Sequence, residues 1–221
     1  MEHMLRNSYF DGKVQKGFMP KVAGCIEHAA HLQAAIEDAH KHTRSICCSW
    51  IDAENAFGSI RHMFIQHALS HYHVPFHLRR LVYNHYQRLF ATVTTKDFST
   101  SVSQYQVGVF QGGTDCTVLF NIVFQLLLDT IGTRSNIERC AYKFKADPTM
   151  ALLLAAYADD LEIVTCTAEQ NQELLAVCES WFCWTRGMRM KPPKCVAFAA
   201  KRFTRPSKFT PLTSHVYSPY D

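Results

Sequence analysis

The spacing of apolar residues predicts a helix and then a buried strand in the first quarter of the chain. Between Lys21 and Thr43 apolar residues recur at helical spacing, although Gly24 weakens the first turn. From Ser45 to Ile51 the pattern changes to a short apolar run. A run of this kind is typical of a strand buried on both faces, so we expect a strand whose end presents Asp52.

The middle of the chain predicts two helices followed by a pair of strands. Arg61–Ser70 and Pro75–Leu89 have helical periodicity, and Pro75 opens the second helix at its first position. Ala91–Val109 is rich in Thr, Val, Ser and Tyr with partial alternation. This composition predicts two strands, joined near Lys96 and Asp97.

The second half of the chain begins with a predicted apolar helix and a hairpin. Thr114–Ile131 carries a stripe of large apolar residues at helical spacing, which we expect to be buried. A strand that ends at Tyr157 and a second strand over Leu161–Cys166 enclose two acidic residues. The pattern therefore predicts a hairpin with Asp159 and Asp160 at its tip.

A last helix and a last strand complete the predicted order. Thr167 and Gln170 can form a capping box that opens a helix running to Arg186, and Gly187 suits its C-terminal turn. After two prolines, Cys195–Ala199 has the composition of a strand. Strands and helices do not alternate strictly, so the fold class expected is α+β.

Composition sets the expected size and compartment. The chain has 221 residues, of which 48% are hydrophobic, and can bury a core as one continuous unit with lobes. Its longest apolar run, Met150–Ala158, is shorter than the roughly 20 residues that span a bilayer, so no membrane partner is expected. The nine cysteines are odd in number and lack regular pairing distances, which favours a reducing, intracellular compartment, the nucleus or the cytoplasm. Cys47 and Cys48 are interpreted as core filler.

Histidines crowd one stretch and raise the question of zinc. His67 and His71 have the helical spacing of a zinc-ligand pair, and His73 and His77 follow. Pro75 interrupts the run, however, and no cysteine lies at ligand spacing. We therefore expect no zinc, while a zinc-binding interaction module remains the alternative from this stretch alone.

Charge is informative only by its distribution. The formal net charge of +4 is a weak argument for a nucleic-acid partner. Between Trp181 and Asp221 basic residues recur and are opposed only by Asp221. This stretch is either a phosphate-facing surface or a solvated tail.

Two adjacent aspartates between apolar strands are the first chemical signal. Neighbouring carboxylates repel each other unless a cation compensates, and hard divalent cations prefer carboxylate oxygens. Two such cations can serve the attacking hydroxyl, the triphosphate and the leaving pyrophosphate of nucleotidyl transfer. From Asp159 and Asp160 alone, a plain hairpin turn stays open as the alternative.

Ordered motifs over nearly the whole chain resemble those of reverse transcriptases, particularly the non-LTR (LINE-type) retrotransposon enzymes. Ile51-Asp-Ala-Glu-Asn-Ala-Phe57 resembles the first aspartate motif, and Tyr157-Ala-Asp-Asp160 is similar to the metal-binding hairpin. Three more segments resemble motifs of the family, namely Gln15-Lys-Gly-Phe18, Val107 to Asn121 around Gln111-Gly112, and Gly187-Met-Arg-Met-Lys-Pro-Pro-Lys194-Cys.

The resemblance implies a set of site residues. By the family pattern Asp52 and Asp159 would hold two Mg²⁺ ions, Asp160 would complete the metal site, and Mn²⁺ is an alternative ion. The Ala53 carbonyl would add a backbone ligand, and Lys194 matches the lysine proposed to protonate the leaving pyrophosphate. The substrate-binding set implied is Ala53, Phe57 beneath the incoming sugar, the turn at Gln111 and Gly112, and Tyr157. A core phenylalanine is the alternative for Phe57, and a surface lysine for Lys194.

The same resemblance implies a fold, partners and an activity. We expect a right-hand polymerase palm with partial fingers over residues 1–200, without a thumb, followed by a basic tail over 201–221; the fingers are assigned to about 1–45 and 75–107. The expected activity is RNA-directed DNA synthesis, with an RNA template, a DNA primer and dNTPs as partners. Asp115 departs from the family pattern near an anionic substrate, so the alternative is a truncated or decayed copy that binds nucleic acid without catalysis.

Overall fold

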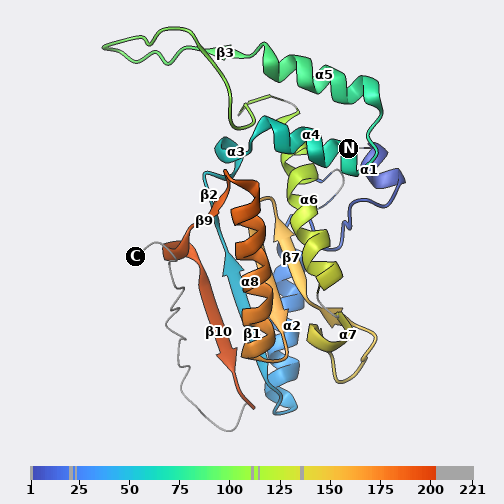
Figure 1. Ribbon diagram of the computed structural model, residues 1–221. Coiled ribbons are helices and arrows are strands. Elements are labelled where there is room, and N and C mark those ends of the chain that lie inside the picture. Colours follow the sequence, from blue (N-terminus) through green and yellow to red (C-terminus); the bar gives the residue numbers. More distant parts are fainter. Residues whose placement is uncertain are drawn as a thin grey trace.

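A four-stranded antiparallel sheet forms the centre of the molecule (Figure 1). A computed structural model describes residues 2–19, 22, 24–110, 112–113, 115–134 and 137–202. The strands lie in the order β10-β1-β8-β7, so the strand nearest the N-terminus pairs with the last one. The central sheet consists of β1 (Ile46–Ile51), β7 (Leu154–Tyr157), β8 (Asp160–Thr165) and β10 (Val196–Ala200).

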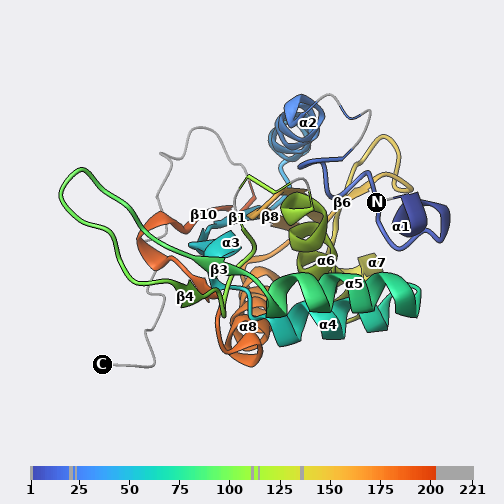
Figure 2. The ribbon, with the colours of Figure 1, turned by 90° about the horizontal axis from the view of Figure 1, so that it is seen from above.

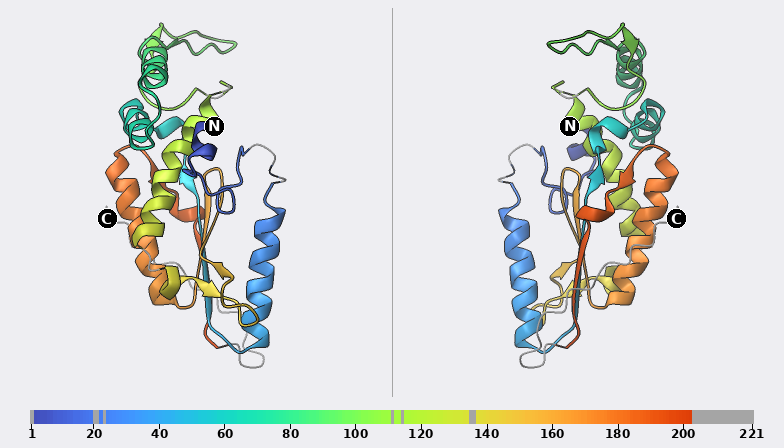
Figure 3. Two further views of the ribbon diagram at one scale, coloured as in Figure 1. Left: turned by 90° about the vertical axis from the view of Figure 1, so that its right-hand side faces the viewer. Right: turned by 90° about the vertical axis from the view of Figure 1, so that its left-hand side faces the viewer.

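Helices cover both faces of this sheet. In Figure 3, α6 and α8 lie on one face and α2 on the other. These covering helices are α2 (Ile26–Lys41), α6 (Cys116–Arg134) and α8 (Ala168–Thr185). The other helices are α1 (Glu2–Arg6), α3 (Ala56–Ser59), α4 (His62–His71), α5 (Phe76–Gln87), α7 (Ile137–Cys140) and the 3₁₀ turn η1 (Pro192–Lys194). The short strands outside the central sheet are β2 (Ala53–Glu54), β3 (Phe90–Ala91), β4 (Ser103–Gln104), β5 (Tyr142–Lys143), β6 (Ala151–Leu152) and β9 (Arg189–Met190).

The predicted strands of the central sheet are confirmed, with one correction at the hairpin tip: the turn consists of Ala158 and Asp159, and Asp160 is the first residue of β8. The pair of strands predicted over Ala91–Val109 is limited to the two-residue strands β3 and β4. β1 was expected over Ser45–Ile51, and the two strands around Asp159-Asp160 pair as an antiparallel hairpin. Successive residues of β1 face opposite sides, which gives the core two compartments. Ile51 packs in the larger cluster with α6 and α8, whereas Ile46 and Cys48 pack in a smaller cluster beneath α2.

Three predicted helix boundaries or caps are corrected. α2 begins at Ile26 and not at Lys21, because Gly24 takes a left-handed φ of 85°. Pro75 is the N-cap of α5 rather than its first residue. The left-handed C-cap of α8 is Arg186 (φ 53°) and not Gly187, whose absent Cβ would instead lie 2.3 Å from the Ser59 carbonyl oxygen. Gly187 therefore permits a close backbone contact.

Helix α6 is buried on most of its sides. It starts at Cys116 and continues to Arg134, beyond the predicted end at Ile131, and Phe120, Phe124 and Leu128 are buried in addition to the predicted stripe. Within the described ranges α6 alone has the length and composition to cross a membrane, but 67% of its apolar stretch is buried inside the fold. Its apolarity is accounted for by this central position.

Helices α4 and α5 lie side by side above the sheet, and the β3–β4 hairpin projects from them (Figure 2). The hairpin turns at Lys96 and Asp97 as predicted, with the Thr95 N–H donating to the Phe98 carbonyl over 2.8 Å. Only Tyr86 of α5 is buried. This part of the chain therefore presents most of its side chains outward.

Candidate active site

The two acidic motifs meet at one end of the central sheet. β1 ends at Ile51, which pairs with Leu161 of β8, and Tyr157 pairs with Asp160 across the hairpin. Asp52 follows Ile51 directly, so it lies beyond the end of β1 at the edge of the sheet where the hairpin turns. The antiparallel register thus brings together carboxylates that are more than 100 positions apart in sequence.

The hairpin carboxyls are partly buried, and their pKa values respond to one another and to Asp52. Burial raises the pKa of Asp159, and the charges of Asp160 and Asp52 raise it further, while Lys194 opposes the shift. The pKa of Asp160 is raised by the same causes, burial first and then Asp52. Each raised pKa means that the neighbouring groups disfavour the ionised carboxylate, which a bound cation would stabilise.

Lys194 provides the cation that faces these carboxylates. Its Nζ lies 3.2 Å from Asp52 Oδ2, and the side chain is 58% exposed. The position follows from η1, because the Lys191 N–H donates to the Asp52 carbonyl over 2.9 Å and the turn then brings Lys194 back toward Asp52. Among the described residues, no three His, Cys, Asp or Glu side chains are arranged to hold a metal ion. Asp52 is instead paired with Lys194.

The segment after Asp52 carries two of the predicted substrate-binding residues. Ala53 is buried in β2 and pairs with Met190 of β9. Phe57, in α3, is half-buried, and its ring stacks on Phe120 with centroids 4.2 Å apart. Phe18 contacts the same ring edge-on at 6.0 Å. Phe57 therefore packs against the core and stays partly exposed.

The other predicted residues of the site are placed less completely. Tyr157 is 41% exposed at the end of β7. Gly112 adopts a left-handed φ of 102°, a conformation that glycine reaches without strain, and nothing lies within 4 Å of the position of its absent Cβ. Gln111 lies outside the described residues.

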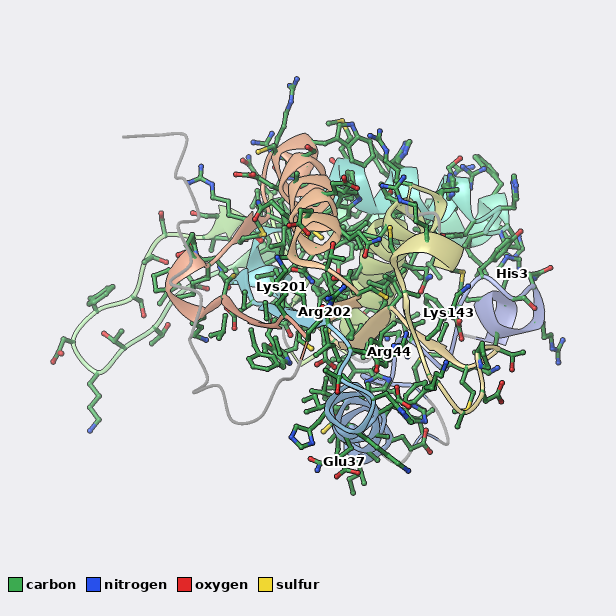
Figure 4. All side chains as sticks on the ribbon, turned by 90° about the horizontal axis from the view of Figure 1, so that it is seen from below. His3, Glu37, Arg44, Lys143, Lys201 and Arg202 are labelled. Atoms are coloured by element: carbon green, nitrogen blue, oxygen red, sulfur yellow. The ribbon has the colours of Figure 1, made fainter. Side chains whose placement is uncertain are left out.

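The described part of the basic stretch, for which a phosphate-facing surface and a solvated tail were the two interpretations, is divided between the two ends of the sheet. Arg189, Lys191 and Lys194 lie with Asp52 at the acidic end. Lys201 and Arg202 lie at the opposite end, where the Arg202 N–H donates to Ser45 Oγ over 3.1 Å and where Figure 4 shows both near Arg44. The stretch beyond Arg202 lies outside the described residues.

A match to a known protein family decides which family this fold belongs to. Residues 1–212 match the family described as reverse transcriptase (RNA-dependent DNA polymerase). The chain belongs to the reverse transcriptase family. The match includes every motif from Gln15 to Lys194 that suggested the resemblance.

Curated relatives of this reverse transcriptase are Pol polyproteins of retrotransposable elements, which confirms the expected LINE-type affinity. One is the retrovirus-related Pol polyprotein from type-2 retrotransposable element R2DM of Drosophila melanogaster, 28% identical over 201 residues, covering 86% of this chain and 18% of the relative. Another, from type-1 retrotransposable element R2 of Popillia japonica, is 27% identical over 150 residues, covering 68% of this chain and 24% of the relative. The chain thus spans about a fifth to a quarter of these relatives.

Solved structures with a similar fold are telomerases. Apo telomerase from Candida tropicalis has a TM-score of 0.63 at 10% identity, over 89% of this chain and 35% of that one. Telomerase from Candida albicans in complex with a TWJ fragment of telomeric RNA has a TM-score of 0.61 at 10% identity, over 93% and 34%. This likeness supports a polymerase palm fold for the mixed helix and strand architecture.

One residue of this reverse transcriptase was missed by sequence reasoning. Gln15 belongs to a segment that only resembled an upstream family motif, yet its side chain is buried against the hairpin turn, where it hydrogen-bonds the backbone of Ala158. Gly17, two residues later, was the available signal, because an added Cβ would lie 2.1 Å from the Ala158 nitrogen. A glycine beside a polar residue in an otherwise extended segment indicates close backbone approach.

Proposed function

We propose that this chain is the polymerase core of a retroelement reverse transcriptase, which adds dNTPs to the 3′-hydroxyl of a DNA primer on an RNA template. The observation that supports this activity most directly is the convergence of Asp52, Asp159, Asp160 and Lys194 at one end of the palm sheet. These four groups come from three separate motifs. Together they form a small acidic site with one mobile cation beside it.

The donor chemistry of the three carboxylates suits a pair of divalent ions, Mg²⁺ or Mn²⁺ in its place, although among the described residues these side chains are not already arranged around an ion. Carboxylate oxygens are the ligands that these hard cations prefer. Burial first, and then neighbouring carboxylates, raise the pKa values of Asp159 and Asp160, and a bound cation would favour their ionised forms. Bound there, the ions would activate the primer hydroxyl and neutralise charge on the triphosphate. The Ala53 carbonyl is the proposed backbone ligand.

Residues around the carboxylates are assigned roles in the same reaction. Lys194 is 58% exposed and reaches Asp52 on a flexible stem, so it can transfer to a pyrophosphate leaving group and donate a proton to it. Phe57 is fixed by its stack on Phe120 and is proposed to exclude a 2′-hydroxyl from the sugar site. Tyr157 and Gly112, with Gln111 outside the described residues, are proposed to contact the incoming nucleotide and the template.

The charge distribution above the sheet supports a nucleic-acid partner. Residues 55–96 contain no Asp or Glu. Arg80 is exposed on α5, and Arg88 is exposed at the C-cap of the same helix. Exposed Tyr83 and Phe90 lie among these cations and can stack on bases. We assign this region, residues 75–107, to the fingers of a right-hand polymerase and the sheet to its palm.

Primer extension with the full chain tests the proposal. An RNA template with a DNA primer, dNTPs and Mg²⁺ is expected to give extension products, and Asp160→Asn is expected to reduce the rate by at least about a hundredfold because one proposed metal ligand loses its charge. Asp147→Asn is the matched control, since Asp147 lies in the exposed turn between β5 and β6 and should leave the rate unchanged. Equal extension by wild type and Asp160→Asn would refute the metal site.

The salt dependence of binding checks the partner separately. Arg80→Gln with Arg88→Gln is expected to weaken binding to primer–template and to reduce the slope of log affinity against log salt, because phosphate contacts release counterions. Lys201→Gln with Arg202→Gln, at the opposite end of the sheet, is the control with the same change in charge. If both double variants behaved alike, the assignment of α5 to the nucleic-acid surface would be wrong.

A further inference from the structure

The side-chain amide of Gln15 hydrogen-bonds both backbone groups of one residue in the acidic hairpin, Ala158. Its Nε2 donates to the Ala158 carbonyl over 3.1 Å, and its Oε1 accepts from the Ala158 N–H over 2.9 Å. The same Oε1 accepts from the Gly17 N–H over 2.8 Å. The side chain is 1% exposed, so water does not compete for these bonds.

Ala158 is the residue that gives the hairpin turn its shape. It adopts a left-handed φ of 57°, which an L-residue with a Cβ reaches only under strain. Asp159 follows directly, so the conformation of Ala158 sets the direction in which the Asp159 carboxyl leaves the sheet. Pairing both backbone groups of Ala158 with Gln15 offsets the strain and selects this one conformation.

The segment that carries Gln15 is itself anchored to two elements. The Lys16 N–H donates to the Ala156 carbonyl over 2.9 Å, and the Ala156 N–H donates to the Val14 carbonyl over 2.8 Å, so the segment lies along the free edge of β7. Asn121 of α6 donates from Nδ2 to the Gly17 carbonyl over 2.7 Å. Gln15 is thus held as rigidly as the turn that it contacts.

We propose that Gln15 is the positioning residue of the metal site: it holds Ala158 in the left-handed conformation and so directs Asp159 toward the divalent cation. This inference rests on the proposed function. A neutral amide is suited to the role, because it presents a donor and an acceptor side by side without adding charge next to three carboxylates. Gln15 touches no reacting atom and acts only through the turn.

The test uses Gln15→Met, which keeps the length of the side chain but removes both polar atoms. Binding of Mn²⁺ is measured by electron paramagnetic resonance, and hydrogen exchange is followed at the amides of Gly17 and Ala158. We expect at least a tenfold increase in the Mn²⁺ dissociation constant, faster exchange at both amides, and a parallel loss of extension rate. A residue that only contributed to stability would leave the Mn²⁺ affinity of the folded protein unchanged.

Asn171→Leu is the matched control. Asn171 of α8 is another buried amide, 2% exposed. Its Nδ2 donates to the carbonyl of Ile163, a residue of β8 in the central sheet, over 3.3 Å. It lies away from the turn and has no role in the proposed reaction. Its loss is expected to lower the unfolding midpoint, as Gln15→Met does, with less than a twofold change in Mn²⁺ affinity.

The outcomes separate this inference from the proposed function. If the wild type binds Mn²⁺ and Gln15→Met binds it within twofold of the same affinity, the positioning role is refuted while the proposed function stands. Wild-type protein that binds no Mn²⁺ would overturn both. Should Gln15→Met not fold, Gln15→Asn provides the second test, because an amide one methylene shorter cannot reach both groups of Ala158, and its dissociation constant should rise at least threefold.

Discussion

The ammonium nitrogen of Lys194 lies 3.2 Å from Oδ2 of Asp52, although the two residues are 142 positions apart in sequence. Each belongs to a different family motif. They meet because β1, which ends just before Asp52, pairs antiparallel with β10, which begins just after η1 and Lys194. Lys194 therefore places its positive charge on the carboxylate that is proposed to ligate a divalent cation. Competition between these two cations for Asp52 has a measurable consequence.

Lys194→Gln is expected to bind Mn²⁺ about two- to fivefold more tightly than wild type. An exposed pair of unit charges near 4 Å apart interacts by about 1 kcal/mol in water, which sets the upper limit of the gain. The same variant should extend a primer more slowly, since it lacks the proposed proton donor. Lys201→Gln, at the other end of the sheet, should change neither quantity, and weaker Mn²⁺ binding by Lys194→Gln would contradict the competition.

Asp159→Asn is expected to raise the thermal unfolding midpoint of the metal-free protein at pH 7. The pKa of Asp159 is raised by burial and by its acidic neighbours, so the folded state holds the proton more tightly than the unfolded state. Such a group favours folding most below its unfolded pKa of 3.8, and that contribution is lost as pH rises through the folded pKa. The advantage of the asparagine should therefore shrink as the pH falls toward 4.

Replacing the exposed Asp147 with asparagine should shift the thermal unfolding midpoint in the opposite direction. Hydrogen bonds from the Thr149 side chain and N–H lower its pKa, so its carboxylate favours folding above pH 3.8 and loses this effect on acidification. Asp147→Asn should lower the midpoint slightly at pH 7. If both substitutions shifted the midpoint in the same direction, the electrostatic account of the hairpin would be wrong.

Phe57→Val is expected to admit ribonucleotides more readily. The smaller side chain leaves space beneath the sugar, and the discrimination between dNTPs and rNTPs, measured as the ratio of kcat/KM values, should fall by at least tenfold. Loss of the stack on Phe120 should also cost about 1–2 kcal/mol of unfolding free energy, less than for a fully buried phenylalanine. Phe144→Val, a half-buried ring beside Tyr142, serves as the control that loses stability without loss of discrimination.

Thiol labelling in the native protein should divide the cysteines by burial. Cys25 and Cys183 are exposed, whereas burial raises the pKa of Cys47 to about 11 and also raises that of Cys48. At pH 8 a maleimide should modify Cys25 and Cys183 within minutes, because thiolate is the reactive form. Mass spectrometry should find Cys47 and Cys48 modified only after denaturation, and their rapid native labelling would contradict the buried β1.

Local patterns were sufficient to predict the elements that carry the three proposed metal-binding carboxylates. The apolar run before Asp52 and the two apolar segments around Asp159-Asp160 each have a composition typical of a buried strand, and the strands are confirmed. Periodicity predicted less about α6, because a helix buried on most sides has no polar face to define its stripe. The roles of the individual site residues remain predictions that the experiments above address.

Long-range contacts explain what the sequence did not reveal. Gly187 suited a helix C-cap by local rules, but Arg186 takes the left-handed conformation and Gly187 is required by the carbonyl of Ser59 in another element. The partner of Gln15 lies on a distant hairpin, and no local property of a glutamine indicates such a partner. A phosphate-facing surface was one of two interpretations of the basic stretch from Trp181 onward, whereas β10 carries Lys201 and Arg202 to the far end of the sheet.

The pairing of Gln15 with Ala158 also determines when the site can form during synthesis. The two residues are 143 positions apart, and a ribosome that adds about 5–20 residues per second needs roughly 7–30 s to pass from one to the other. Throughout that time the N-terminal segment has no β7 edge to join. The acidic turn is therefore among the last parts of the nascent chain to reach its final shape, and a chain released before Ala158 emerges carries Asp52 without the rest of the site.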